Sequence, residues 1–202
     1  MRPRTGPQAL PSRAVDSAAV ISRGDRCVFV HQRKCAGMAI MASFGITPDD
    51  PDFHFANDGL LSPEWTSQAE LISRCFTFAV VRNPWDRFVS GWRYCRSTRK
   101  RTIVDVLKHL PADGHDYRHV TRSQCSTLYR PDGALAVDHV IRYEALEEGF
   151  AEVCDIIGRP HTALLRINVG RRPDYRDVFD SEARRLFDAR FAEDIERLGY
   201  SY

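Results

Sequence analysis

The chain has 202 residues, of which 43% are hydrophobic and 28% are charged, values that are ordinary for a globular domain with its own core. Its 29 basic and 27 acidic residues leave a net charge of only +2, which argues against a general nucleic-acid coat. No run approaches the roughly 20 apolar residues of a membrane-spanning helix. We therefore expect one domain, with no nucleic acid as partner and no transmembrane segment.

The first 25 residues are rich in proline and arginine, and we expect them to form a loosely ordered N-terminal arm before a domain over residues 26–202. They contain no apolar stretch typical of a signal peptide, which favours a cytoplasmic location. The six cysteines include no C-x-x-C pair. This spacing predicts reduced thiols rather than a zinc ribbon or a redox motif.

Residues 27–30 form a short apolar run that predicts a strand buried on both faces. A loop over residues 31–37 leads into a predicted helix over residues 38–44. Ser62 and Pro63 have the pattern of an N-cap and first helical residue, and they open a helix to about residue 72. Residues 75–81 predict a second buried strand.

Asn83 and Pro84 begin a predicted helix that runs to about residue 97. A shorter helix over residues 102–110 precedes a loop-rich segment over residues 111–134. Beyond it we expect a strand over 137–143, a helix over 144–157 closed by Gly158, and a last helix from Ser181 to about Leu198. Alternating strands and helices predict a three-layer α/β fold, with a mainly parallel central sheet flanked by helices.

The loop after the first strand is the first candidate site, and it reads His31-Gln32-Arg33-Lys34-Cys35-Ala36-Gly37-Met38-Ala39. A loop that leads from a parallel strand into a helix directs backbone N–H groups at an anion. Lys34 adds a mobile cation. The order of residues is not that of a Walker A loop, in which the lysine follows the last glycine. The alternative is a surface lysine beside a tight turn.

The second candidate site follows the second strand. Arg82 stands at the carboxyl end of this strand, where open α/β sheets bind ligands. Ser90 lies two helical turns further on and can share a face with it. Seven cations and one acid lie between Arg82 and Arg101, and arginine forks suit phosphate oxygens. The alternatives are a solvated helix face, an arginine that caps the sheet edge and a serine that only packs.

These two segments resemble the phosphate-binding motifs of the sulfotransferase superfamily, of the carbohydrate type with its bacterial relatives. The loop resembles the 5′-phosphosulfate motif F-V-H-x-P-K-T-x-G-T-S, and residues 82–90 resemble the 3′-phosphate motif R-N-P-W-D-R-x-V-S. Residues 124–129, 137–146 and 191–200 resemble further family segments in the same order. The resemblance covers roughly residues 26–202 and implies a P-loop-like fold.

The resemblance also implies a reaction, the transfer of a sulfuryl group from 3′-phosphoadenosine 5′-phosphosulfate to an acceptor hydroxyl on a carbohydrate or small metabolite. Lys34 would neutralise the leaving group, and His54 is the candidate general base. His119 and Gln124 are candidate acceptor contacts, and no metal is implied. The residues implied in nucleotide binding are Arg33, Lys34, Cys35, Ala36, Gly37, Met38, Ala39, Arg82, Ser90, Asn168, Arg171 and Arg172.

The chain departs from the family pattern at two loop positions, and these departures leave alternatives open. Arg33 replaces a proline, and Met38 stands where a hydroxyl side chain usually binds the 5′-phosphate. Losing such a charge-assisted hydrogen bond costs roughly 1.5–3 kcal/mol. A nucleotide-binding protein with weak or no turnover is therefore one alternative. A nucleotide kinase is another, against which the missing G-x-x-x-x-G-K-[ST] motif argues.

Overall fold

A computed structural model describes residues 19–22, 24–46, 69–165 and 173–202. Its single sheet has the strand order β1 (Ala19–Ser22), β2 (Cys27–Val30), β3 (Phe76–Val81) and β4 (His139–Arg142). Strands β2, β3 and β4 are parallel, and β1 pairs with β2 in the antiparallel sense. The prediction of an α/β fold with a central parallel sheet flanked by helices is confirmed.

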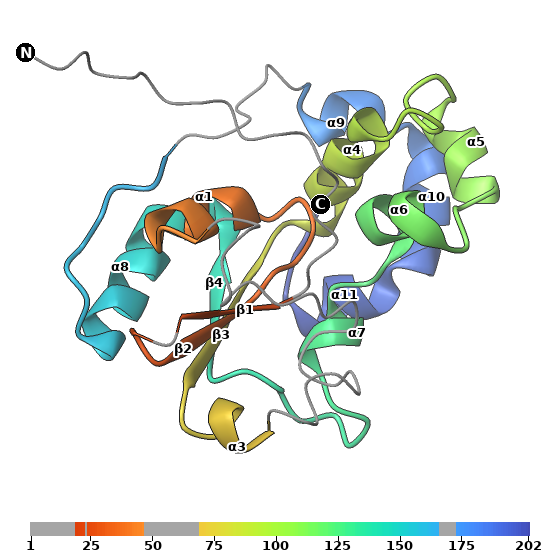
Figure 1. Ribbon diagram of the computed structural model, residues 1–202. Coiled ribbons are helices and arrows are strands. Elements are labelled where there is room, and N and C mark those ends of the chain that lie inside the picture. Colours follow the sequence, from red (N-terminus) through yellow and green to blue (C-terminus); the bar gives the residue numbers. More distant parts are fainter. Residues whose placement is uncertain (1–18, 23, 47–68, 166–172) are drawn as a thin grey trace, which may run out of the picture.

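The helices surround this sheet (Figure 1). They are α1 (Gly37–Ser43), α3 (Ala69–Ile72), α4 (Pro84–Tyr94), α5 (Ile103–Lys108), α6 (Gly114–Asp116), α7 (Cys125–Leu128), α8 (Leu146–Ile157), α9 (Tyr175–Val178), α10 (Ser181–Arg190) and α11 (Ala192–Arg197). A π-helical turn, η2 (Tyr117–Thr121), continues α6, and a 3-10 turn, η3 (Tyr143–Ala145), precedes α8. Within the described residues, no helix is long and apolar enough to cross a membrane.

Apolar side chains on the two faces of the sheet belong to different clusters, as the alternation along a strand requires. Phe78 and Val80 of β3 pack with α1 and α8, where Phe150 joins them. Ala79 and Val81 of the same strand face the opposite way and pack with α7 and with Leu198, the residue that ends α11. Helices therefore cover both faces, which explains why the strands are continuous apolar runs.

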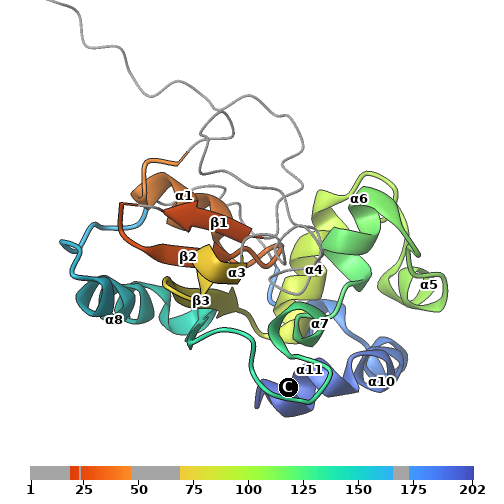
Figure 2. The same cartoon turned by 60° about the horizontal axis from the view of Figure 1, so that its bottom comes forward.

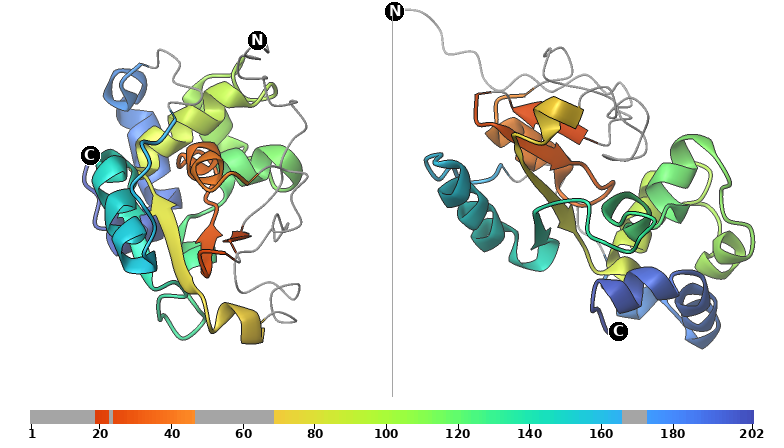
Figure 3. Two further views of the ribbon diagram at one scale, coloured as in Figure 1. Left: turned by 60° about the vertical axis from the view of Figure 1, so that its left-hand side comes forward. Right: turned by 90° about the horizontal axis from the view of Figure 1, so that it is seen from below.

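A second hydrophobic core lies beyond the sheet. Trp85 and Phe88 of α4 pack there against residues of α5, η2 and α10, including Val106, Val120 and Phe187. Figures 1 and 2 show α4, α5, α6 and α10 gathered on one side, away from α1 and α8. Figure 3 shows the same separation from below. Helix α4 thus connects the end of β3 to a second group of helices, whose core does not include residues of the sheet.

Several predicted helix ends agree with the structure. The Asn83 side chain caps α4 by accepting from the N–H groups of Trp85 and Asp86, at 3.1 and 3.2 Å. Gly158 ends α8 with a φ of 69°, in the left-handed region that glycine tolerates best. The helix predicted from Ser62 is described only as α3, because residues 47–68 lie outside the described part.

Other predictions need correction. Residues 19–22, within the expected N-terminal arm, form β1 because they extend the sheet by pairing with β2. The segment 111–134, expected to be loop-rich, also contains the short elements α6, η2 and α7. The last helix begins at Ser181 as predicted, and its cap is Asp180, whose side chain accepts from the N–H of Ala183 at 2.8 Å. It also breaks at Phe191 into α10 and α11.

The contact between α4 and η2 depends on Gly91 and generates the first prediction. A Cβ at Gly91 would lie 2.1 Å from the carbonyl oxygen of His119, which is backbone and cannot rotate away. We expect Gly91→Ala to lower the free energy of unfolding by about 1–3 kcal/mol, the usual cost of overpacking. Urea unfolding measures it. Gly24→Ala is the control, because a Cβ there meets nothing within 4 Å; equal stability of the two variants would contradict the prediction.

Candidate active site

The carboxyl ends of the three parallel strands meet at one place, where each strand contributes a group. Strand β2 leads into the Lys34 loop, β3 ends at Arg82, and β4 runs into Tyr143. The Arg82 guanidinium lies 4.3 Å from the centre of the Tyr143 ring, and its Nη1 donates to the carbonyl of Lys34 at 2.9 Å. The two motifs that the sequence singled out are therefore in direct contact.

The backbone of the loop bends sharply at two residues that are not glycine. Lys34 and Ala36 have φ angles of 69° and 57°, in the left-handed region. Such conformations cost of order 1–3 kcal/mol each and persist only when the surroundings hold them. Ala36 is also the N-cap of α1, and its carbonyl accepts from the N–H groups of Ala39 and Ile40. Backbone that alternates between right-handed and left-handed conformations directs successive N–H groups into a concave site that can bind an anion.

Gly37 is required where the loop enters α1. A Cβ at this position would lie 1.9 Å from Nε2 of His31, so the imidazole occupies the space that a side chain would need. His31 is itself buried, and its pKa is lowered to about 3, mainly by burial and further by Arg33 and Lys34. The loop therefore folds over a neutral histidine at its base.

Arg82 is buried, with 2% of its surface exposed, which differs from the open position that its place at the end of β3 suggested. Its Nε donates to Asp86 Oδ2 at 2.7 Å, and its Nη2 contacts the same oxygen. Arg87, also buried, donates from Nε to the carbonyl of Arg33 at 3.1 Å. Both arginines therefore hold carbonyls of the Lys34 loop, and phosphate binding by Arg82 stays a prediction.

Gln124 has a different task from the acceptor contact that the sequence suggested. Its side chain is fully buried, and its amide brackets the backbone of Arg82. Oε1 accepts from the N–H of Arg82 at 3.0 Å, and Nε2 donates to the Arg82 carbonyl at 2.9 Å. Oε1 also accepts from the thiol of Cys35 at 3.5 Å. Gln124 is therefore a positioning residue that joins the end of β3 to the Lys34 loop.

Asp194 of α11 holds Gln124 in turn. Its buried carboxylate accepts from the backbone N–H groups of Gln124 and Cys125, both at 2.9 Å, and from the Ser123 hydroxyl at 2.5 Å. Three donors on one carboxylate satisfy most of its lone pairs, which is what burial of a charge demands. The C-terminal segment therefore contributes to the site through the hydrogen bonds that position Gln124.

The side chain of Lys34 lies beside a cluster of three rings, those of Tyr94, His115 and His119. Its Nζ lies 3.8 Å from the centre of the Tyr94 ring. The same tyrosine packs against His119 at 4.7 Å and His115 at 5.7 Å between ring centres. Burial lowers the pKa of His119 to about 2, with smaller effects from Arg33 and His115, so its imidazole is neutral at ordinary pH. The structure thus brings His119 near Lys34, as a weak proton acceptor.

The other predicted site residues divide into described and undescribed ones. Cys35 is buried, and burial raises its pKa to about 11, so its thiol keeps its proton and points to Gln124. Met38 is half-buried, and Ser90 is buried on α4, one turn after Arg87. The predicted residues that lie outside the described part are His54, Asn168, Arg171 and Arg172; their roles stay predictions.

Sequence reasoning missed the partners that place these residues. Asp86 has a readable signal, because it stands four residues after Arg82 and the two can meet on the first helical turn. No local pattern in the sequence indicates the role of Glu144. Its Oε1 accepts from the N–H of Asn83 at 2.7 Å, and 61 positions of sequence separate the two residues. Tyr94 was also missed, since nothing local shows that its ring meets Lys34.

The chain matches the family model of the sulfotransferase family over residues 59–201, more than half of its length, and it belongs to this family. The matched part includes Arg82, Ser90, Gln124 and Asp194, and it begins after the Lys34 loop. Comparisons with curated proteins and with solved structures gave no match. Family membership indicates a sulfotransfer role, and the contacts of Arg82 place the unmatched loop in the same site.

The two buried histidines predict how stability depends on pH. The pKa values of His31 and His119 are about 3 and about 2 in the folded protein, against about 6.5 in an unfolded chain. The unfolded state therefore binds more protons below pH 6.5, and stability falls as the pH falls toward 3. We expect each histidine to contribute a loss of about 1 kcal/mol between pH 6 and pH 5, measured by urea unfolding.

His119→Phe is the variant that tests this, because a ring at this position keeps the stack on Tyr94. It should reduce the fall in stability between pH 6 and pH 5 by about 1 kcal/mol. His161→Ala, which removes an exposed histidine outside this ring cluster, is the control variant. The same fall in His119→Phe and in the unmodified protein would contradict the prediction.

Proposed function

We propose that the protein transfers a sulfuryl group from 3′-phosphoadenosine 5′-phosphosulfate to a hydroxyl group of a carbohydrate or small metabolite. The observation that carries the proposal is the contact between the two phosphate motifs. Arg82 Nη1 donates to the Lys34 carbonyl, and Arg87 Nε donates to the Arg33 carbonyl. The loop and the start of α4 are thus one rigid unit, as expected if they bind two phosphates of one nucleotide.

The 5′-phosphosulfate is assigned to the Lys34 loop. The order of β2, loop and α1 supports a P-loop-like phosphate site, although the lysine precedes the glycine. Because the Cys35 thiol is turned inward and Met38 offers no hydroxyl, the loop binds through its backbone N–H groups and through the Lys34 ammonium. The 3′-phosphate is assigned to the end of β3 and to α4, which carry Arg82 and Ser90, and to Asn168, Arg171 and Arg172, which lie outside the described residues.

The chemical step needs positioning and charge stabilisation more than covalent catalysis. The acceptor oxygen forms a bond to sulfur while the bond from sulfur to the bridging oxygen breaks. The electron pair of that bond stays on the 5′-phosphate, where the Lys34 ammonium neutralises the growing charge. Lys34 must leave the Tyr94 ring to do this, and a cation–π contact of about 0.5–2 kcal/mol is weak enough to exchange for a phosphate oxygen.

The acceptor proton goes to a general base, which we assign to His54. His119 is the other candidate near Lys34, but a pKa of about 2 makes it a poor proton acceptor at neutral pH. His54 lies between the two phosphate motifs in the sequence. The proton balance is then complete: the acceptor loses its proton to imidazole, and adenosine 3′,5′-bisphosphate leaves.

Binding of adenosine 3′,5′-bisphosphate is the direct test of the donor site. At about 100 times its Kd, it should stabilise the protein by roughly 2.7 kcal/mol, a rise in Tm of roughly 5–10 °C. Adenosine 5′-monophosphate should give a smaller rise, because it lacks the 3′-phosphate. Thermal unfolding with each nucleotide at equal concentration measures this.

Ser90→Ala should reduce the advantage of the bisphosphate over the monophosphate, since Ser90 is assigned to the 3′-phosphate. No stabilisation by the bisphosphate at millimolar concentration would contradict the proposal. A larger shift with ATP and magnesium would favour the kinase alternative. Binding of the bisphosphate without any transfer from labelled donor to sugars or phenols would favour the inactive member of the family.

Substitution of Lys34 and substitution of His54 should affect transfer in different ways. Lys34→Ala is expected to lower kcat by about 10²–10³-fold at saturating donor, because it loses a contact made to the leaving group. His54→Ala is expected to lower transfer by about 10²–10⁴-fold while the affinity for the bisphosphate stays the same. Steady-state kinetics with labelled donor, together with the Kd of the bisphosphate, separate the two effects.

Lys108→Ala is the matched control, because Lys108 pairs with Glu182 at 2.7 Å on α5 and α10, away from the loop. It should keep normal kcat. If Lys34→Ala behaves like Lys108→Ala, the assignment of Lys34 to the leaving group is wrong.

A further inference from the structure

Three side chains of different chemistry meet next to the Tyr94 ring. Cys95, His115 and Asp116 each present one ligand atom, and these atoms all lie within 4.8 Å of one another. The Cys95 Sγ is 4.0 Å from His115 Nδ1, which is 2.8 Å from Asp116 Oδ1. In the part of the chain that the structure describes, no second group of three such side chains converges in this way.

The fold holds these side chains together, although they come from two separate elements. Cys95 directly follows α4, with 1% of its surface exposed, and its N–H donates to the Gly91 carbonyl at 3.0 Å. His115 and Asp116 belong to α6, which continues into η2. The close contact of Gly91 with η2 fixes α6 against the end of α4. The three ligand atoms are therefore preorganised by the backbone.

The spacing of the three atoms suits a tetrahedral ion. Bonds of roughly 2.0–2.3 Å from zinc to nitrogen, oxygen and sulfur place ligand atoms about 3.3–3.5 Å apart. The two observed distances, 4.0 and 2.8 Å, lie on either side of this value, and each differs from it by roughly half an ångström. A rotation of the half-buried His115 and Asp116 side chains covers such a difference.

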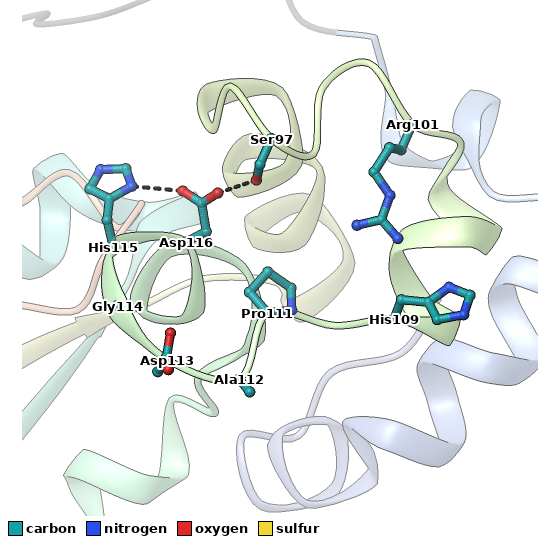
Figure 4. Close-up of a pocket in the computed structure, with 9 residues that line it drawn as sticks. All are labelled: Ser97, Arg101, His109, Pro111, Ala112, Asp113, Gly114, His115 and Asp116. Carbon is teal, nitrogen blue, oxygen red and sulfur yellow. Dashed lines mark hydrogen bonds and ion pairs between the residues drawn. The ribbon is translucent and has the colours of Figure 1, made fainter.

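A second group orients the carboxylate, as in known metal sites. The Ser97 hydroxyl donates to Asp116 Oδ2 and leaves Oδ1 toward the imidazole. Figure 4 shows Ser97 and His115 on opposite sides of Asp116, both contacting it. Ser97, His115 and Asp116 line a pocket of about 550 Å³, so solvent reaches the imidazole and the carboxylate, whereas Cys95 is buried and does not line it.

We propose that Cys95, His115 and Asp116 bind a zinc ion. Thiolate, imidazole and carboxylate together suit zinc better than magnesium or calcium, which prefer oxygen ligands only. The thiol proton is released as the sulfur binds the metal, and water from the pocket takes the fourth position. The ion clamps α6 to the end of α4, and through the His115 ring it fixes the stack of Tyr94 and His119 beside Lys34.

This site is separate from the proposed donor site and does not rest on it. Local spacing does not reveal this site, because twenty positions separate Cys95 from His115 and no C-x-x-C pair is present. His115 and His119 do have an H-x₃-H spacing, but the partners that converge with His115 are Cys95 and Asp116. The three residues become recognisable as a site only when α6 is placed against α4.

Titration of the chelator-treated full chain with Zn²⁺ and Co²⁺ tests the proposal. Competition with a chromophoric chelator should show one Zn²⁺ per chain, and Co²⁺ should give a thiolate-to-metal absorption band. Cys95→Ser should remove this band and weaken Zn²⁺ binding by about 100-fold. Asp116→Asn, which alters a partly exposed side chain, should keep the band but weaken binding by about 10-fold or more.

The same three residue types in α8 and after it provide matched controls. Asp155 contacts His161 at 2.7 Å, and Cys154 is buried in the core of the sheet layer, but the three do not converge. Cys154→Ser and Asp155→Asn should therefore leave zinc affinity unchanged. Near-ultraviolet circular dichroism and Tm verify that each variant is folded.

The outcomes decide the proposal in either direction. A cobalt–thiolate band in the unmodified protein, lost in Cys95→Ser and kept in Cys154→Ser, supports it. Absence of the band, or equal zinc affinity in the unmodified protein and in Asp116→Asn, overturns it. If Cys95→Ser does not fold, the band and Asp116→Asn still decide. Affinity for adenosine 3′,5′-bisphosphate, measured on the same variants, is expected to stay, so a failure here is distinct from a failure of the donor site.

Discussion

The buried guanidinium of Arg82 is the group on which the rest of the site depends. Removing such a charge from water costs several kcal/mol unless it is paired and fully hydrogen-bonded. Asp86 supplies the charge, Tyr143 covers one face, and the carbonyl of Lys34 accepts from Nη1. The hydrogen bond from Arg82 to the Lys34 carbonyl helps to hold Lys34 in its left-handed conformation, a kind of backbone strain that costs of order 1–3 kcal/mol. The loop is therefore held ready before any nucleotide arrives.

The family segments spaced along the chain are one polar network in space. Asp194 near the C-terminus holds the N–H of Gln124, the Gln124 amide brackets the backbone of Arg82, and Arg82 holds the Lys34 loop. Every member is nearly or fully buried except the loop itself. A network of this kind specifies a single arrangement, since each broken contact leaves a buried polar group without its partner. The C-terminal segment is thus needed to position a lysine about 160 residues before it in the sequence.

Local signals account for what the sequence predicts correctly. The apolar runs at β2 and β3, the Asn83 cap and the left-handed Gly158 are each decided by a few neighbouring residues. The task of Gln124 and the burial of Arg82 are decided by partners far away in the chain. Phe191, where the last helix breaks, likewise packs in a core with residues of α4 about 100 positions earlier. A charged residue at a strand end is usually exposed. Arg82 is buried because Asp86 and the Lys34 carbonyl lie close enough to pair with it, and this becomes visible only in the structure.

Tyr94 connects the two sites that the structure defines. Its ring contacts the Lys34 ammonium and also stacks on His115, a proposed zinc ligand. With 51% of its surface exposed, the ring is not held by the hydrophobic core, so its position depends on these neighbours. A metal that fixes His115 removes alternative positions of the ring and hence of the resting lysine. Any coupling between metal and donor nucleotide must then act through the free energy of moving Lys34 from the ring to the phosphate, which is a few kcal/mol at most.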